Sequence, residues 1–540
     1  DGKGQNRRTA SRLTNSTQHS FPGLWMTSAA LHGHVRKRPE FPRRIWQSMG
    51  MHPLDPDISY RALQSRDARF DGRLFVGVIS TGIYCRPICP ARTPKRDNCR
   101  FFSCSAGAQA AGFRACLRCR PEIAPELPGW RGTSNTVSRA LTLIADGFLD
   151  QEDGTVEALA MRVGMGARQL RRLFDQHLGV APVAVAQSRR LLFAKQLLHD
   201  TRLSMADVAL AGGFRSVRRF NAAFRSVYHR SPGALRRATA TATSTPASTA
   251  PVILQISYRP PYDWAGMLQY LHARAIDGLE VVDKGVYRRS IYHEGLTGSI
   301  TIQHRPDRAS LLATIVFPSV RALQSIVSRI RHQFDVAADI DAIAAHLLQD
   351  DALAALVSER PGLRVPGCWD GFELAVRAVL GQQISVSAAR GLGGILVELW
   401  GDPLLNSDDS RLTRTFPTAR CLATADLSRL GMPASRRATI TALAQAATIN
   451  PGLFTPGGAV EERLAQLRAI PGVGTWTADY IALRAFHEPD AFPSTDLGLL
   501  RGARQLKGGE PRTASRLLQR AEVWRPWRAY AAQYLWTVEQ

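Results

Sequence analysis

The chain has 540 residues, of which 45% are hydrophobic, and a formal net charge of +24 at pH 7. This length predicts several domains, and the absence of any apolar run of about 18 residues excludes a membrane-spanning helix. The positive charge favours a polyanionic partner such as double-stranded DNA, although a coding bias toward arginine and alanine would give the same charge. We expect a cytoplasmic protein without a membrane partner.

The first compact segment predicted along the chain holds most of the cysteines. Residues 1–53 are polar, basic and without periodicity, so we predict a disordered arm there, with a DNA-binding tail as the alternative. Residues 54–127 then contain two short-spaced pairs, Cys85-x3-Cys89 and Cys116-x2-Cys119. Two such pairs suit a tetrahedral site of four thiolates and predict bound Zn²⁺. From spacing alone, that ion could simply stabilise a small domain.

The segment from Arg66 to Pro121 closely resembles the N-terminal domain of the Ada family of adaptive-response regulators. The motifs TGIYCRPICPAR and GFRACLRCRP carry this resemblance. It implies that Cys85 is both a metal ligand and the acceptor of a methyl group from a DNA methylphosphotriester, in a stoichiometric step. A metal-bound thiolate is a reasonable nucleophile for that chemistry. Ala115 stands where the family usually has proline, outside the ligands.

Residues 134–237 show a repeated pattern of helix, glycine turn and basic helix. The two copies are Thr155–Leu173 and Ser204–Arg225, and they predict a pair of helix-turn-helix units, with a small helical bundle as the alternative. The stretches LRRLFDQHLGVAP and GFRSVRRFNAAFRSVYHRSP resemble the AraC-type DNA-binding domain, although the second has Tyr228-His229-Arg230 where that family often keeps a glycine before Ser-Pro. The predicted DNA contacts are Arg168, Arg171, Arg172, Arg218 and Arg219.

A change in composition separates the second half of the chain from the first. Residues 238–251 contain ATATATSTPASTA, which is free of charge and predicts a flexible linker. Residues 252–335 mix β-rich runs with helical ones, and residues 336–540 are almost wholly helical in pattern.

The stretch LRAIPGVGTWTADYIALRAF, residues 467–486, predicts two helices joined by a tight turn. Gly472 and Gly474 allow that turn, and amides at the start of the second helix can bind a DNA phosphate. Asp496 follows 22 residues after Gly474. Together with RPPYDWAGMLQYLHARA and AEVWRPWRAYAAQYLW, this pattern resembles the helix-hairpin-helix DNA glycosylases, and within them the AlkA family of 3-methyladenine DNA glycosylase II, across residues 252–540.

That resemblance implies roles for individual residues. Asp496 occupies the position of the catalytic aspartate, although an aspartate before Leu-Gly-Leu-Leu also reads as a helix N-cap. Trp476 lies where lyase members of the superfamily carry a lysine, so no amine is available for a Schiff base and the reaction should stop at an abasic site. The implied substrate pocket comprises the aromatic residues Trp476, Tyr480 and Trp527 and the wedge residue Gln383.

We therefore expect a multidomain α+β protein with a small zinc domain, an all-α double helix-turn-helix domain, an AlkA-like α+β subdomain and an all-α helix-hairpin-helix core. The expected function is removal of alkylated bases, joined to transcriptional regulation through promoter DNA and RNA polymerase. A regulator with an inactive glycosylase fold is the alternative. No Pro-Cys-His-Arg motif occurs, so we expect no direct repair of O6-alkylguanine.

Overall fold

The computed structural model describes residues 55–125, 135–151, 153–239, 251–404, 407–456, 459–506 and 513–538. The predicted arm, and nearly all of the predicted linker, lie outside the described residues. Within the described ranges, no helix combines the length and apolar character that crossing a membrane requires.

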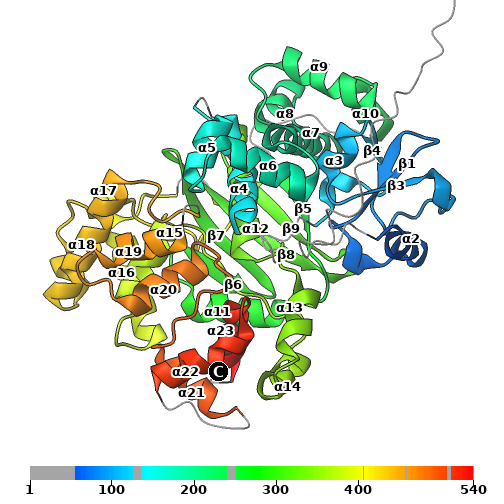
Figure 1. The fold of residues 1–540 in the computed structure, drawn as a ribbon. Coiled ribbons are helices and arrows are strands. Elements are labelled where there is room, and N and C mark those ends of the chain that lie inside the picture. Colours follow the sequence, from blue (N-terminus) through cyan, green and yellow to red (C-terminus); the bar gives the residue numbers. More distant parts are fainter. Residues whose placement is uncertain are drawn as a thin grey trace, which may run out of the picture. The chain divides into compact units, whose positions relative to one another are not determined.

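A small sheet organises residues 55–125, here called the cysteine module (Figure 1). Its strands lie in the order β3-β1-β2-β4, and β2 pairs with β4 in parallel, Tyr84 opposite Ala115. This register brings the next residues, Cys85 and Cys116, to the same end of the sheet. The elements are α2 (Pro56–Ser65), β1 (Phe75–Val78), β2 (Ile83–Cys85), β3 (Cys99–Phe102), α3 (Ser105–Ala110) and β4 (Arg114–Ala115).

Residues 135–239 form two helix-turn-helix units joined by the long helix α7 (Figure 1). Gly164 and Gly213, both with positive φ, make the turns inside the units, as predicted. His229 ends the second unit at φ 54°, so it adopts the left-handed conformation for which a glycine is usual. The helices are α4 (Asn135–Ala145), α5 (Val156–Arg162), α6 (Ala167–Leu178), α7 (Pro182–Asp200), α8 (Met205–Ala211), α9 (Val217–Tyr228) and α10 (Pro232–Thr239).

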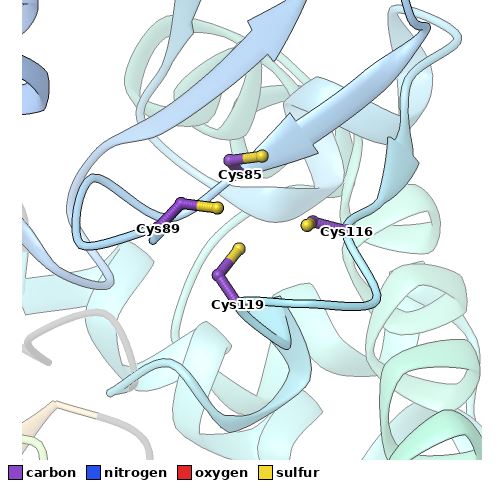
Figure 2. Close-up of side chains that lie close together, drawn as sticks. All are labelled: Cys85, Cys89, Cys116 and Cys119. Atoms are coloured by element: carbon purple, nitrogen blue, oxygen red, sulfur yellow. The ribbon is translucent and has the colours of Figure 1, made fainter. Parts of the chain in front are cut away.

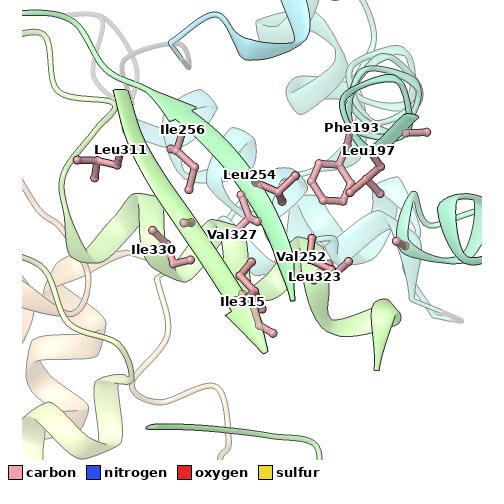
Figure 3. Close-up of a cluster of buried hydrophobic side chains, with 14 of the residues drawn as sticks. Phe193, Leu197, Val252, Leu254, Ile256, Leu311, Ile315, Leu323, Val327 and Ile330 are labelled. Carbon is pink, nitrogen blue, oxygen red and sulfur yellow. The ribbon is translucent and has the colours of Figure 1, made fainter. Parts of the chain in front are cut away.

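An antiparallel sheet of five strands, in the order β5-β9-β8-β7-β6, follows residue 251. Lys284-Gly285 and Glu294-Gly295 make its tight turns with positive φ at both residues, as two-residue hairpins require. Burial alternates along β5, so that one face packs on helix α12 (Figure 3). The elements are β5 (Val252–Ser257), α11 (Trp264–Arg274), β6 (Glu280–Asp283), β7 (Val286–His293), β8 (Leu296–Arg305), β9 (Ser310–Val316) and α12 (Leu323–Gln333).

The remaining residues are helical, as the sequence predicts, and pack around two apolar clusters. One cluster contains Val379, Leu396, Ile440 and Ile481, and the other is built around Trp524 and Leu535. The helices are α13 (Ile340–Leu347), α14 (Asp351–Glu359), α15 (Gly371–Leu380), α16 (Val386–Trp400), α17 (Ala419–Leu422), α18 (Ala434–Ile449), α19 (Val460–Arg468), α20 (Thr475–Arg484), α21 (Leu497–Arg504), α22 (Ala514–Arg520) and α23 (Arg528–Thr537).

Candidate functional site

The four predicted cysteines come together at one end of the small sheet (Figure 2). The sulfur atoms of Cys85, Cys89, Cys116 and Cys119 all lie within 4.8 Å of one another. Four converging thiols form a donor set for a tetrahedral soft-metal site. The two cysteines in the intervening loop lie elsewhere: Cys99 donates to the Lys95 carbonyl, and the Cys104 sulfur caps α3. The structure thus confirms the cluster that the spacing predicts.

The four thiols differ in their surroundings. Backbone amides of Arg86 and Arg118 donate to the sulfurs of Cys119 and Cys116, each at 3.3 Å, and the Ala91 amide also donates to Cys89. An N–H donor stabilises a thiolate and so makes it a weaker nucleophile. Among the described residues, no backbone amide donates to Cys85, and Cys85 is the only one of the four that is not buried.

A buried ion pair supports the cluster from behind. The Arg86 guanidinium donates to Asp71 Oδ1 at 2.8 Å and to the Cys119 carbonyl at 3.2 Å. Both side chains are less than a tenth exposed. Burial alone would lower the pKa of Arg86, but the Asp71 carboxylate raises it. The pair therefore holds the backbone of a metal-ligand residue in place.

The five predicted DNA-contacting arginines lie on the second helix of each helix-turn-helix unit. Arg168, Arg171 and Arg172 are exposed on α6, while Arg218 and Arg219 are exposed in the first turn of α9. Arg171 forms an ion pair with Glu157 of α5. These are the helices that enter the major groove in such units.

The predicted hairpin lies between α19 and α20. Gly472 has φ 84°, and a Cβ there would lie 1.9 Å from Thr439 Oγ1, so only glycine fits. Gly474 is the N-cap of α20, exposed, with no heavy atom within 4 Å of an added Cβ. Gln382 binds this turn, because its side-chain amide donates to the Gly472 carbonyl at 3.3 Å.

Asp496 is both a helix cap and the centre of an aromatic cluster. Its Oδ1 accepts the Leu499 amide at 2.9 Å as the N-cap of α21. The indole N–H of Trp476 donates to Oδ2 at 2.7 Å, and that of Trp536 donates to Oδ1 at 2.9 Å. Asp496 is thus the N-cap that the sequence offered as one alternative, and the same carboxylate also accepts hydrogen bonds from two indoles.

Two tyrosines extend this cluster toward the five-stranded sheet. Tyr480 stacks on Trp476 with ring centroids 5.4 Å apart and an interplanar angle of 15°. Its hydroxyl lies 3.2 Å from the hydroxyl of Tyr270 on α11. Burial raises the pKa of Tyr480 to about 12, so its hydroxyl stays protonated at neutral pH. The guanidinium of Arg484 lies over the rings of Tyr270 and Trp536, 4.7 and 5.0 Å from their centroids.

The other two predicted pocket residues lie at the start of α23 and in the loop between α15 and α16. Trp527 is 7% exposed and meets Tyr530 edge-on in the helical core. Gln383 lies on the exposed loop between α15 and α16, with φ 57°. The sequence analysis overlooked Trp536 and Tyr270, although both lie in the motifs that carry the resemblance. Because Trp527 and Trp536 are nine residues apart at the two ends of α23, they point to roughly opposite sides of that helix.

The cysteine cluster, the paired helix-turn-helix units and the hairpin followed by a carboxylate define a protein that combines a metal-binding module, a DNA-binding module and a glycosylase fold. Three family profiles match in the same order: the metal binding domain of Ada at residues 59–122, a helix-turn-helix domain at 159–238 and the AlkA N-terminal domain at 253–370.

Curated relatives match single parts or nearly the whole chain. The "Probable bifunctional transcriptional activator/DNA repair enzyme AlkA" of Mycobacterium tuberculosis is 42% identical over 89% of this chain and 96% of its own length. DNA-3-methyladenine glycosylase 2 of Escherichia coli is 34% identical over 53% of this chain and 96% of its own length. The "Bifunctional transcriptional activator/DNA repair enzyme Ada" of the same organism is 38% identical over 25% of this chain and 37% of its own length. The chain belongs to the family of the bifunctional transcriptional activator/DNA repair enzyme AlkA.

Proposed function

We propose that the protein repairs alkylated DNA as a monofunctional glycosylase and reports methylphosphotriesters as a transcriptional regulator. The observation that carries the glycosylase proposal is the Asp496 carboxylate, held by the indole N–H groups of Trp476 and Trp536 beside stacked aromatic rings. The proposed substrates are bases of the 3-methyladenine type in double-stranded DNA.

The target base must leave the helix, because its glycosidic bond is inaccessible within the stack. Trp476 and Tyr480 stack on each other, so an outer face of this pair can accept a flipped, positively charged purine, an attraction worth about 0.5–2 kcal/mol for the contacting ring. As the C1′–N bond breaks, the bonding electrons go to the base and positive charge develops on the sugar. Asp496 stabilises that charge, and water adds at C1′ and loses a proton.

The reaction ends at an abasic site, because the position that would supply an amine holds Trp476. The product can be tested directly by incubating the protein with alkylated DNA and sodium borohydride. We expect free base to be released without a trapped protein–DNA adduct. A trapped adduct would show that an amine elsewhere forms a Schiff base.

Release of 3-methyladenine from methylated DNA is the decisive assay. Replacement of the carboxylate in Asp496→Asn should lower the release rate by at least about a hundred-fold. The matched control is Asp307→Asn, which changes an exposed carboxylate beside Arg305 and should leave the rate unchanged. If the wild-type protein melts cooperatively but releases no base, the glycosylase proposal is wrong, and the protein is a regulator with an inactive glycosylase fold.

Cys85 is the proposed methyl acceptor, with Zn²⁺ as the proposed metal. Zinc bound by the four cysteines would keep the Cys85 thiol deprotonated. The Cys85 sulfur attacks the methyl carbon of the phosphotriester, an S–C bond forms, and the C–O electron pair remains on the phosphate as a diester. Cys85 is more exposed than the other three ligands, and no amide of the described chain weakens it as a nucleophile.

Methylation removes one negative charge from the cluster, so its repulsion from DNA phosphates falls and DNA affinity should rise. The exposed arginines of α6 and α9 are the proposed contacts to promoter DNA, and RNA polymerase is the proposed partner of the DNA-bound form. Gel-shift titrations before and after methylation test this step. Equal affinity of the two forms would contradict it.

A further inference from the structure

The cysteine module and the five-stranded sheet share one hydrophobic core, and helix α7 lies between them. Phe193 and Leu197 of α7 are buried in the same cluster as Val252 and Leu254 of β5 (Figure 3). Strand β5 is the edge of its sheet. The side-chain amide of Gln196, 2% exposed, donates to the Gln255 carbonyl at 2.9 Å, so α7 also provides a hydrogen bond to that edge.

A first polar connection runs from the cluster through α7. Lys195 is fully buried and donates to the Cys116 carbonyl at 3.2 Å. The same ammonium group forms an ion pair with Glu122, at the end of the cysteine module. The next residue in α7 is Gln196, which binds β5. Thus two consecutive residues contact a metal-ligand segment and the sheet edge.

A second connection avoids α7 and passes through Arg259. Asp71, which binds Arg86 beside the cluster, also accepts from Arg259 Nε through its carbonyl at 3.2 Å. The same guanidinium donates to the Ala337 carbonyl at 3.0 Å, and Arg259 is 1% exposed. A buried charge of this kind is stable only with its full set of partners. The hydrogen-bond acceptors of the Arg259 guanidinium therefore come from both the cysteine module and the C-terminal half.

Further hydrogen bonds continue from Arg259 toward Asp496. Arg364 donates to the carbonyls of Arg259 and Asp335 at 2.5 and 3.0 Å. The Asp335 carboxylate accepts the Tyr530 hydroxyl at 3.0 Å. Tyr530 lies on α23, the helix that also carries Trp536. Contiguous networks of this type can carry free energy between sites.

We propose that the cysteine module docks on the C-terminal half through Arg259 and α7, so that the state of the cysteine cluster changes the stability of the glycosylase half. This proposal needs a metal-bound cluster but no glycosylase activity. Loss of the metal frees the two ligand segments, residues 85–89 and 116–119, and so weakens the contacts that Arg86, Asp71 and Lys195 make with them. The edge strand β5 and helix α23 then open more often.

Hydrogen exchange of the full-length protein tests the docking without using activity. Peptides covering residues 252–259 and 528–537 are compared before and after removal of the metal with a chelator. In the wild-type protein, removal should speed exchange in both peptides by about ten-fold or more, which is the effect of losing one buried charged hydrogen bond. Unchanged exchange there, with faster exchange in residues 82–120, would overturn the proposal.

Variants show whether the contacts of Arg259 and Gln196 carry the effect. In Arg259→Gln, exchange in residues 252–259 should be fast already with metal bound, and metal removal should add less than about two-fold. The matched control Arg305→Gln changes an exposed arginine at the end of β8 and should respond as the wild type does. If Arg259→Gln does not fold, Gln196→Ala replaces it with the same expectation. A wild-type response in the folded variant would overturn the proposal.

Discussion

The cysteine cluster and the Asp496 site are assembled in different ways. The cluster takes its four sulfurs from two short segments that one parallel strand pair brings side by side. Asp496 instead meets Trp476, 20 residues before it, and Trp536, 40 residues after it. The partner of Tyr480, Tyr270, is 210 residues away. A site built from local spacing can be predicted in full from the sequence, whereas one built from distant helices is predicted only in part.

The strongest test of this comparison is Cys85→Ser, because it removes a proposed function completely. After incubation with methylated DNA, mass spectrometry should find a methyl group on the wild-type protein and none on the variant. Cys99→Ser is the control, since Cys99 lies outside the cluster, and it should still take up methyl. Methyl transfer to another cysteine of Cys85→Ser would show that the local environment does not select the acceptor.

Gly472 and Gly474 of the hairpin have the same predicted role in the sequence, but their surroundings differ in the structure. Gly472→Ala should lower the free energy of unfolding by about 1–3 kcal/mol, because the added Cβ meets Thr439 and φ is positive. Gly474→Ala adds a Cβ into open space and should change stability by less than about 0.5 kcal/mol. Chemical denaturation measures both. Equal losses would mean that the turn does not depend on its conformation at Gly472.

Trp536→Phe tests the residue that sequence reasoning overlooked. It removes one indole N–H from the Asp496 carboxylate while keeping an aromatic ring. A hydrogen bond to a charged group contributes about 1.5–3 kcal/mol, so base release should slow by about ten-fold or more. Trp400→Phe, at the end of α16, is the control and should release base at the wild-type rate. An unchanged rate in Trp536→Phe would show that the hydrogen bond from Trp536 to Asp496 does not contribute to base release.

The smallest change in stability at neutral pH is expected for substitution of His332. Its ring Nε2 on α12 donates a hydrogen bond to the carbonyl of Arg484 in α20. Burial lowers the pKa of His332 from 6.5 to about 3. Below about pH 6.5 the unfolded chain therefore binds a proton at His332 that the folded protein does not bind. The contribution of neutral His332 to the free energy of unfolding is present above pH 6.5 and is lost as the pH falls toward 3. The slope approaches about 1.4 kcal/mol per pH unit.

Urea unfolding between pH 7 and 4 should show a shallower dependence in His332→Gln than in the wild type. The exposed His272→Gln should keep the wild-type slope. If the free energy of unfolding depends on pH with the same slope in all three proteins, His332 does not cause that dependence.

Much of the fold follows from local signals, and the reasons are visible in particular residues. The double helix-turn-helix pattern, the hairpin glycines and the β-rich runs after residue 251 are properties of neighbouring residues, and they predicted α5–α6, α8–α9, β8 and β9. The face that a helix turns toward a site is set by packing. For that reason, the sequence analysis named Trp527 and overlooked Trp536, and it did not reveal that Tyr270 approaches Tyr480 from another subdomain.

Strand β5 has a further consequence for how such chains are built. An open sheet edge is a template for pairing with other chains and therefore a risk of aggregation. Here α7 covers that edge and occupies the Gln255 carbonyl. A shorter protein that holds only the part from residue 251 onward must protect the same edge by other means, such as charged side chains or a cap of its own. Fusion to the regulator thus covers an edge of the sheet as well as adding a second site.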